Sequence, residues 1–167
     1  AKTIIDQGGD YILAVKENQG HLYEDLHDLF ADNLQFHYEG IPHSYAKIVN
    51  KNHGRIEIRQ CWTISDPAYL ANIRNLNQWK GIRSLVMILS ERRMGEKCEV
   101  QDRYFISSLE SNAEKILQAK RSYWGIENRL HWTLDIAFNE DRSRVRKDNA
   151  PHNFAILRHM ALNLLKQ

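Results

Sequence analysis

The sequence predicts a mixed α/β fold with a β-rich insertion at about residues 36–109 and helices in its C-terminal part. Three observations lead to this prediction. The continuous apolar run Tyr11–Val15 has the length and composition of a buried strand. Val, Ile, Tyr, Trp and Thr are then frequent from about 36 to 109, in stretches with the two-residue period of strands. After residue 110, apolar residues recur at helical spacing.

The N-terminal region predicts a helix end, a strand, a loop and a helix. Residues 1–7 stop at Gly8-Gly9, which favours the end of a helix. Because Ala1 shows no helix-capping signal, we expect the first residues to continue a preceding segment. We expect Tyr11–Val15 to lie in the centre of a sheet, buried on both faces. The next helix should end near Asp32-Asn33, with its apolar face made by Leu22, Leu26, Leu29 and Phe30.

The run His53–Arg59 alternates between charged and apolar residues. Arg55, Glu57 and Arg59 fall on one face of a strand, and the intervening isoleucines fall on the other. This pattern predicts a half-solvated antiparallel strand. The charged face could contact DNA or could be a solvated surface with cross-strand ion pairs, and the pattern leaves both open. A short helix is expected from Pro67 to about Asn75, and a turn between two strands at Met94–Lys97.

The C-terminal part predicts three helical segments. Ser111 and Glu114 have the spacing of a capping box, and the helix that follows should bury Ile116 and Leu117. Pro151 suits the first turn of a last helix that continues to about Lys166. Two apolar stripes are expected to be buried: Ile126, Leu130, Leu134 and Phe138 in the middle helix, despite Gly125, and Phe154, Leu157, Ala161, Leu164 and Leu165 in the last.

Composition narrows the classes of protein. The 23 basic and 21 acidic residues give a net charge of +2, so any affinity for DNA must come from local clusters of charge. Cys61 and Cys98 form no metal or disulfide framework and are expected to be reduced thiols of a cytoplasmic protein. No apolar stretch reaches the roughly 18 residues of a membrane span, and no signal peptide is recognisable.

Polar residues recur at helical spacing beside the middle stripe. Glu127, His131 and Asp135 are four residues apart and therefore lie on one helical face. A carboxylate at the border of an apolar stripe can be a ligand for a hard metal ion or a general base. The same spacing is compatible with a solvated amphipathic helix, or with a small metallohydrolase in which these three residues form a complete site.

Several separated motifs carry a family resemblance. The run Tyr123–Trp132, followed by Leu134–Asp141, closely resembles the C-terminal signature of insertion-sequence transposases of the H-repeat-associated group. Gly8–Gln19, His53–Glu57 and Leu157–Lys166 also resemble that family, in the same order. Agreement over several motifs is a far more specific signal than one short pattern.

The resemblance implies DNA transposition by a DDE-type enzyme. It implies that residues 1–167 form a single, partial RNase H-like catalytic domain with the β-rich insertion before the third acidic ligand. Glu127 matches that ligand, which makes it both the catalytic and the metal-binding candidate. In the intact family two Mg²⁺ ions bridge the scissile phosphate, which activates the attacking oxygen and stabilises the leaving oxygen. The implied partners are DNA, in particular insertion-sequence ends, and a second copy of the chain.

The sequence departs from the wider transposase pattern in two ways. Related families place arginine four residues before the glutamate and lysine seven after it, whereas Tyr123 and Leu134 stand here. The first two catalytic aspartates are expected upstream of Gly8-Gly9, so the chain should lack them; Asp6 and Asp10 do not match, and Asp10 is expected in the turn before the strand. We therefore expect weak or absent metal binding and no catalysis by this chain alone.

Further polar residues are candidates for contact with DNA phosphates, and a solvated surface is the alternative for each group. They lie at the end of the first strand, around Glu127 and in the basic run that follows: Lys16, Asn18, Gln19, Arg121, Asn128, Arg129, His131, Arg142, Arg144 and Arg146. The tryptophans are expected to be core or interface anchors. The alternative to a catalytic fragment is a non-catalytic DNA-binding or assembly module derived from a transposase.

Overall fold

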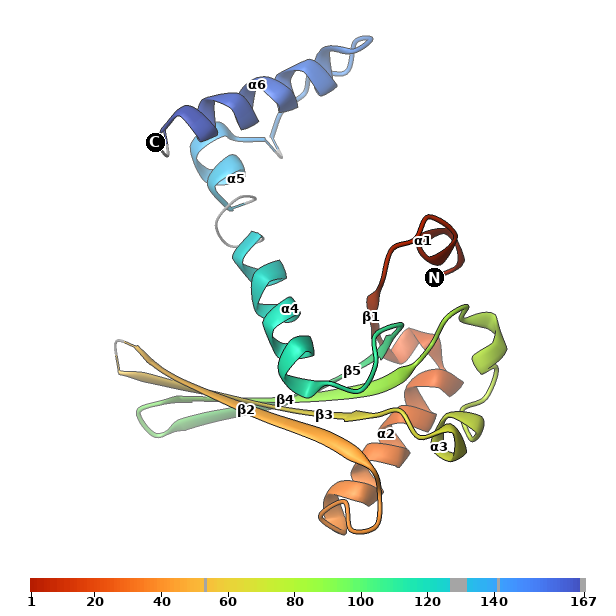
Figure 1. Ribbon diagram of the computed structural model, residues 1–167. Coiled ribbons are helices and arrows are strands. Elements are labelled where there is room, and N and C mark those ends of the chain that lie inside the picture. Colours follow the sequence, from red (N-terminus) through yellow and green to blue (C-terminus); the bar gives the residue numbers. More distant parts are fainter. Residues whose placement is uncertain (53, 127–131, 141, 166–167) are drawn as a thin grey trace. The chain divides into compact units, whose positions relative to one another are not determined.

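The computed structural model describes residues 1–52, 54–126, 132–140 and 142–165. The chain forms two compact units, Ala1–Leu117 and Gln118–Gln167, and helix α4 belongs to both. In chain order (Figure 1) the helices and strands are α1 (Lys2–Asp6), β1 (Ile12–Val15), η1 (Glu17–Gln19), α2 (His21–Gln35), β2 (His43–Asn52), β3 (Arg55–Ile64), α3 (Pro67–Ala71), η2 (Leu76–Gln78), β4 (Ser84–Met94), β5 (Lys97–Ser107), α4 (Ala113–Ile126), α5 (Trp132–Phe138) and α6 (Ala150–Leu165).

The first unit is built on one antiparallel sheet. Its strand order is β1-β5-β4-β3-β2. Strands β2 and β3 form one long hairpin, and β4 and β5 form a second around Gly95, whose positive φ suits the turn. The strands expected between residues 36 and 109 and the turn at Met94–Lys97 are confirmed. The short helix begins at Pro67, as expected, but ends at Ala71 and not near Asn75.

The expected central position of the first strand is wrong. In the described part of the chain β1 lies at the edge of the sheet and pairs only with β5, from Ile12 opposite Ser107 to Val15 opposite Tyr104. Its residues are nevertheless apolar on both sides, because Ile12 packs with the hydrophobic cluster on one face and Leu13 and Val15 with the cluster on the other. A continuous apolar run predicts that both faces of a strand pack against other residues. It does not predict how many strands pair with it.

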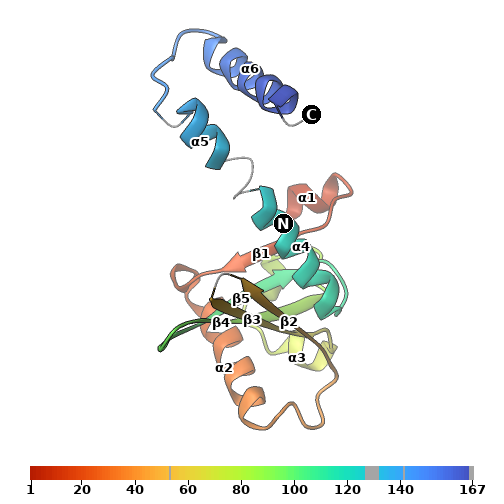
Figure 2. The same ribbon diagram turned by 90° about the vertical axis from the view of Figure 1, so that its left-hand side faces the viewer.

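Helix α2 covers one face of the sheet, as Figures 1 and 2 show. Leu22, Leu26 and Phe30 are buried, as expected. They share a cluster with Trp62 and Tyr38, whose rings stack with centroids 5.8 Å apart. Trp62 is therefore a core anchor, which agrees with the expectation for the tryptophans.

The opposite face of the sheet is covered by the beginning of α4. Ile116 and Leu117 are buried there, as expected, and Ala113 is buried with them. The cluster includes Cys61, and burial raises the pKa of that thiol to about 12. Cys98 is exposed, and both cysteines are free thiols. Ile12 of β1 packs against the same cluster, at the start of α4.

The residue that caps α4 differs from the expectation. The helix begins at Ala113, and the Asn112 side-chain oxygen accepts a hydrogen bond from the backbone N–H of Lys115 at 2.9 Å. The Ser111 hydroxyl instead donates to the backbone oxygen of Thr63 at 2.9 Å and lies 2.6 Å from the Thr63 hydroxyl. The Ser111–Glu114 capping box was wrong because Ser111 fastens the preceding loop to the sheet.

In the second unit, α6 begins with Pro151 in its first turn, as expected, but its buried face was predicted wrongly. Phe154, Leu157 and Leu164 are 46%, 58% and 71% exposed, whereas Leu162 is buried. Leu162 and the buried Leu134 belong to a unit in which α6 packs on α5, a helix of only 7 residues. A short partner covers a narrow strip, so most of the apolar side chains of α6 stay outside it.

No helix in the described ranges combines the length and apolar character that crossing a membrane requires.

We predict that Asn112→Ala lowers the free energy of unfolding of the first unit by about 1 kcal/mol, because the first turn of α4 loses its cap. Asn112→Asp keeps a side-chain acceptor and should stay close to the wild-type value. Urea denaturation followed by far-UV circular dichroism measures the difference. An unchanged midpoint for Asn112→Ala would show that this cap does not stabilise α4.

Candidate functional site

The sequence places the principal candidate, Glu127, immediately after the described part of α4. That part runs from the Asn112 cap to Ile126. Glu127 and its neighbours Asn128, Arg129 and His131 lie outside the described residues. The family resemblance predicts that Glu127 points into a polar cleft near the end of the Tyr11–Val15 strand, and this stays a prediction, as does the burial of Leu130. Leu134, four residues further along the stripe, is buried as predicted.

Two carboxylates near the N-terminus have structural roles. Asp6 is bound by Lys2 at 2.6 Å and by Lys80 at 2.5 Å, and these hydrogen bonds lower the pKa of its carboxyl group. Asp10 accepts a hydrogen bond from the Ser108 hydroxyl at 2.8 Å, and that hydroxyl accepts one from the backbone N–H of Tyr11. Asp10 thus fixes the turn before β1, as expected.

Within the ranges that the structure describes, no three His, Cys, Asp or Glu side chains come together in a way that could hold a metal ion. Asp135 is half-buried on α5 and belongs to no such group there.

The polar residues after β1 divide into two kinds. Lys16 and Asn18 are exposed at the end of the strand. Gln19 is half-buried, and its side-chain oxygen accepts a hydrogen bond from the backbone N–H of Lys16 at 2.8 Å. That bond closes the turn η1, so the oxygen of Gln19 serves the local fold. Lys16 and Asn18 remain accessible to a ligand.

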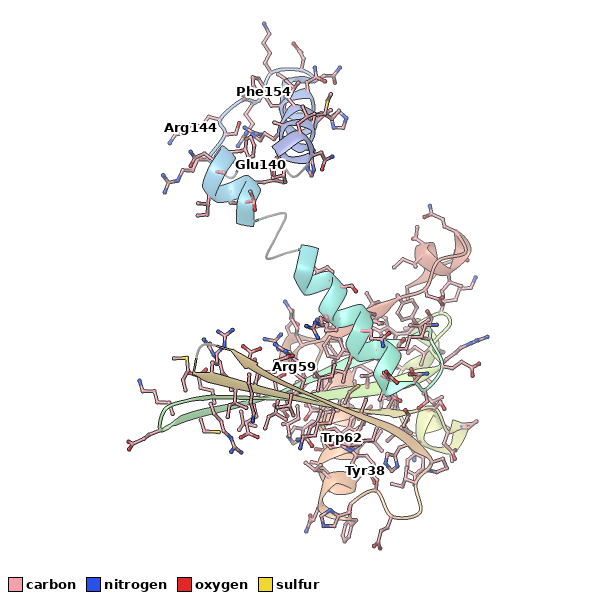
Figure 3. The ribbon with its side chains drawn as sticks, turned by 60° about the vertical axis from the view of Figure 1, so that its left-hand side comes forward. Tyr38, Arg59, Trp62, Glu140, Arg144 and Phe154 are labelled. Atoms are coloured by element: carbon pink, nitrogen blue, oxygen red, sulfur yellow. The ribbon has the colours of Figure 1, made fainter. Side chains whose placement is uncertain are left out.

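The basic run after α5 is accessible in the second unit. Arg142, Arg144 and Arg146 are exposed, and Figure 3 labels Arg144 on this loop. Arg146 donates to the backbone oxygens of Ser143 and Val145 at 2.8 and 2.9 Å, which holds the loop in a tight turn. Arg121, on α4, is also exposed.

Glu140 does not neutralise this basic run. Its carboxylate lies 3.6 Å from a guanidinium nitrogen of Arg158 on α6, and both side chains are largely buried, at 26% and 15% exposure. The Arg158 guanidinium also lies 5.9 Å from the centre of the Phe154 ring. The backbone N–H of Glu140 donates to the oxygen of Leu134. Glu140 and Arg158 therefore tie the end of α5 to α6.

The pairing of Glu140 with Arg158 was not found by sequence reasoning. The two residues are far apart in the chain, and neither helical nor strand periodicity relates them. The only available signal was an arginine inside the apolar stretch of α6, where a charged group needs a partner.

Comparison of the sequence with known protein families identifies the family of this chain. Residues 1–164 match the family described as "Transposase DDE domain".

The chain belongs to the DDE transposase family.

Three relatives agree with this assignment. "Putative protein YbfL" and "H repeat-associated putative transposase YhhI", both from Escherichia coli (strain K12), are each 38% identical over 99% of the chain. "Putative transposase YncI" from Escherichia coli O157:H7 is 37% identical over the same share. The chain spans 43% of the length of the first two relatives and 42% of the third. No solved structure matches the chain.

We predict that Arg158→Ala destabilises the α5–α6 unit by about 1–3 kcal/mol, because it leaves the carboxylate of Glu140 largely buried without its partner. Arg144→Ala, which removes an exposed charge from the neighbouring loop, is the matched control and should change stability by less than about 0.5 kcal/mol. Hydrogen exchange of the α6 amides measures both effects. Equal protection in the two variants would contradict the structural role of the ion pair.

Proposed function

We propose that this chain acts in DNA transposition as the C-terminal part of a DDE transposase catalytic domain, with Glu127 as the third acidic metal ligand. One observation carries the proposal: the family match extends over residues 1–164 and includes the Trp124-Gly125-Ile126-Glu127 pattern. A four-residue pattern on its own occurs by chance in many proteins. A match along nearly the whole chain supports the assignment of Glu127 by its position within the family pattern.

The proposed domain is a single, partial RNase H-like domain covering residues 1–167, with residues 36–109 as a β-rich insertion. The order of elements supports this division. Strand β1 and helix α2 precede the interval, β2 to β5 fall within it, and α4 follows it. Because β1 pairs with β5, the proposed insertion extends the sheet to which β1 belongs.

The family typically uses Mg²⁺, and the described residues do not provide a complete set of ligands for it. Asp6 and Asp10 are engaged by lysines and a serine, and no group of three potential ligands is present in the described ranges. Mg²⁺ binds to carboxylates from more than one element, together with water and substrate phosphates. Glu127 alone therefore does not fit a resident metal site, and no catalytic step is assigned to this chain by itself.

The residues proposed to contact DNA are mainly those whose side chains are exposed. Lys16, Asn18, Arg121 and the arginines at 142, 144 and 146 are exposed, so they are accessible to phosphates. Asn128, Arg129 and His131 complete the proposed set around Glu127, and Gln19 contributes through its turn at Lys16. The DNA that these residues contact is proposed to be the insertion-sequence ends. The protein is proposed to act in the cytoplasm as a homo-oligomer.

A second function is compatible with the same surfaces. A non-catalytic DNA-binding or assembly module derived from a transposase would keep the exposed basic residues and would not need Glu127. The two functions predict different results when the remaining part of a transposase is supplied. Nicking of DNA requires Glu127 only if the chain is part of a catalytic domain.

We predict that the chain alone neither nicks nor joins supercoiled DNA in Mg²⁺ or Mn²⁺, because one carboxylate cannot hold the two ions that phosphoryl transfer requires. Fusing the upstream part of the relative YhhI to this chain should restore metal-dependent nicking. In that fusion Glu127→Ala should reduce nicking to background, while Glu114→Ala, at the start of the same helix, should leave it within a few-fold.

Two outcomes would contradict the proposal. Nicking by the unfused chain that disappears in Glu127→Ala would show that it holds a complete site, and Asp6, Asp10 and Asp135 would then be the ligands to test. A fusion that nicks DNA equally well with and without Glu127 would remove the catalytic role and leave the non-catalytic module.

A further inference from the structure

The two long hairpins extend beyond the helices that cover the rest of the sheet. Figure 1 shows their tips projecting past α2 and past the start of α4 in the first unit. The buried residues of β3, β4 and β5 lie in the half of each strand away from the tips. The other half of each strand is partly or fully exposed on both faces. Leu89 at the start of this half of β4 still packs against the hydrophobic core. The charged side chains nearer the tips are partly or fully exposed, so they are available for another role.

Strand register determines which charged residues share a face. Residues directly opposite each other in paired strands point to the same side of the sheet. Glu57 is opposite Arg92, and Arg92 is opposite Glu99. Applied row by row, this rule defines the hairpin cation face, which lies on the same side of the sheet as Cys61 and consists of Arg55, Glu57, Arg59, Arg92, Lys97, Glu99 and Arg103.

Basic groups outnumber acidic groups on the hairpin cation face by five to two. Glu57 is shared by two arginines, Arg55 at 2.9 Å and Arg59 at 2.8 Å. One carboxylate therefore orders two guanidinium groups without cancelling their charge. Their side chains are 41% and 42% exposed, so each can still accept a second partner.

The remaining arginines of this face are held by neutral groups. Arg103 donates to the side-chain oxygen of Gln101 at 2.9 Å. Arg92 lies 3.8 Å from the sulfur of Met94. These contacts restrict the side chains without adding negative charge, although Glu57 and Glu99 lie opposite Arg92 in the neighbouring strands. Phosphate oxygens are suitable partners for such groups, because guanidinium binds them with paired hydrogen bonds.

The opposite face of the same hairpins is different. It carries three basic residues, Lys47, Lys51 and Arg93, and Arg93 is paired with Glu91. Exposed Val49 and Val100 lie on that side. Glu91 and Asp102 are the acidic residues of that face, so its excess of positive charge is one, against three on the hairpin cation face. A polyanion that approaches the hairpins therefore meets the larger positive charge on the hairpin cation face (Figure 3, where Arg59 and Trp62 lie on opposite sides of the sheet).

The dimensions of the hairpin cation face suit an extended ligand. Arg55 and Lys97 lie in the outermost row and Arg103 lies six residues along β5 from Lys97, a distance of about 20 Å in an antiparallel strand. The face crosses three strands, β3 to β5, which span about 10 Å. Charges spread over such an area can contact several phosphates of one duplex.

We propose that the hairpin cation face binds the phosphate backbone of duplex DNA, independently of base sequence. The choice of nucleic acid over another polyanion rests on the proposed function in transposition. The contacts are from side chains to phosphates, which position a protein on DNA and carry no direct sequence information.

The test compares two triple variants of the full 167-residue chain, in Mg²⁺-free buffer, with random-sequence and insertion-sequence-end duplexes. Arg55→Gln/Arg59→Gln/Arg92→Gln should weaken binding by at least about tenfold and reduce the slope of log K against log salt by about 2 to 3. Lys47→Gln/Lys51→Gln/Arg93→Gln removes the same charge from the opposite face and should have a much smaller effect. Fluorescence anisotropy at several salt concentrations gives both quantities.

A third variant guards against a loss of folding. Lys97→Gln/Arg103→Gln leaves the Arg55–Glu57–Arg59 group intact and should weaken binding on its own, with an unchanged far-UV spectrum and melting curve. The losses should be the same for both duplexes.

Three results would overturn the proposal: equal losses in the two triple variants, no DNA binding by the wild-type chain, or competition by polyglutamate as strong as by DNA at equal charge. The last result would point to an acidic polypeptide. Glu127→Ala should not alter this binding, so failure here is distinct from failure of the catalytic assignment.

Discussion

The two-residue alternation of the antiparallel sheet is the constraint on which the rest of this structure depends. Two long hairpins and β1 form one sheet, and the register fixes which face each side chain occupies. Trp62 faces α2, whereas its neighbour Cys61 faces the start of α4. A slip of one residue would exchange these two positions. The same register gathers the charged residues of the hairpin cation face.

The sequence predicted the elements of the first unit because each has a local signal. Four apolar residues at helical spacing marked α2, and alternation in His53–Arg59 marked the solvated part of β3. Position within the sheet had no such signal. The run Tyr11–Val15 is apolar on both sides at an edge, and only pairing with β5 reveals that edge. Ser111 and Asn112 are both good caps, and the tertiary bond to Thr63 decided between them.

In the candidate site, too, some residues could be predicted from local sequence patterns and others could not. Glu127 could be chosen from sequence because the family signature surrounds it, and the family itself is now established by the match over residues 1–164. The engagement of Asp10 by Ser108 agrees with its expected place in a turn. The ion pair of Glu140 with Arg158 and the shared face of Arg92 with Glu57 depend on contacts between distant segments, which periodicity cannot reveal.

We propose above all that this chain contributes one acidic ligand, Glu127, to a metal site that it does not complete alone. The most direct test is to titrate Mn²⁺ into the 167-residue chain. Binding is measured by the loss of the electron paramagnetic resonance signal of the free ion. The claim predicts no saturable binding at micromolar metal, and the same weak uptake for wild type and Glu127→Ala. Tight stoichiometric binding that is lost on substitution of Glu127, His131 or Asp135 would contradict it, and would make the chain a complete metal site of its own.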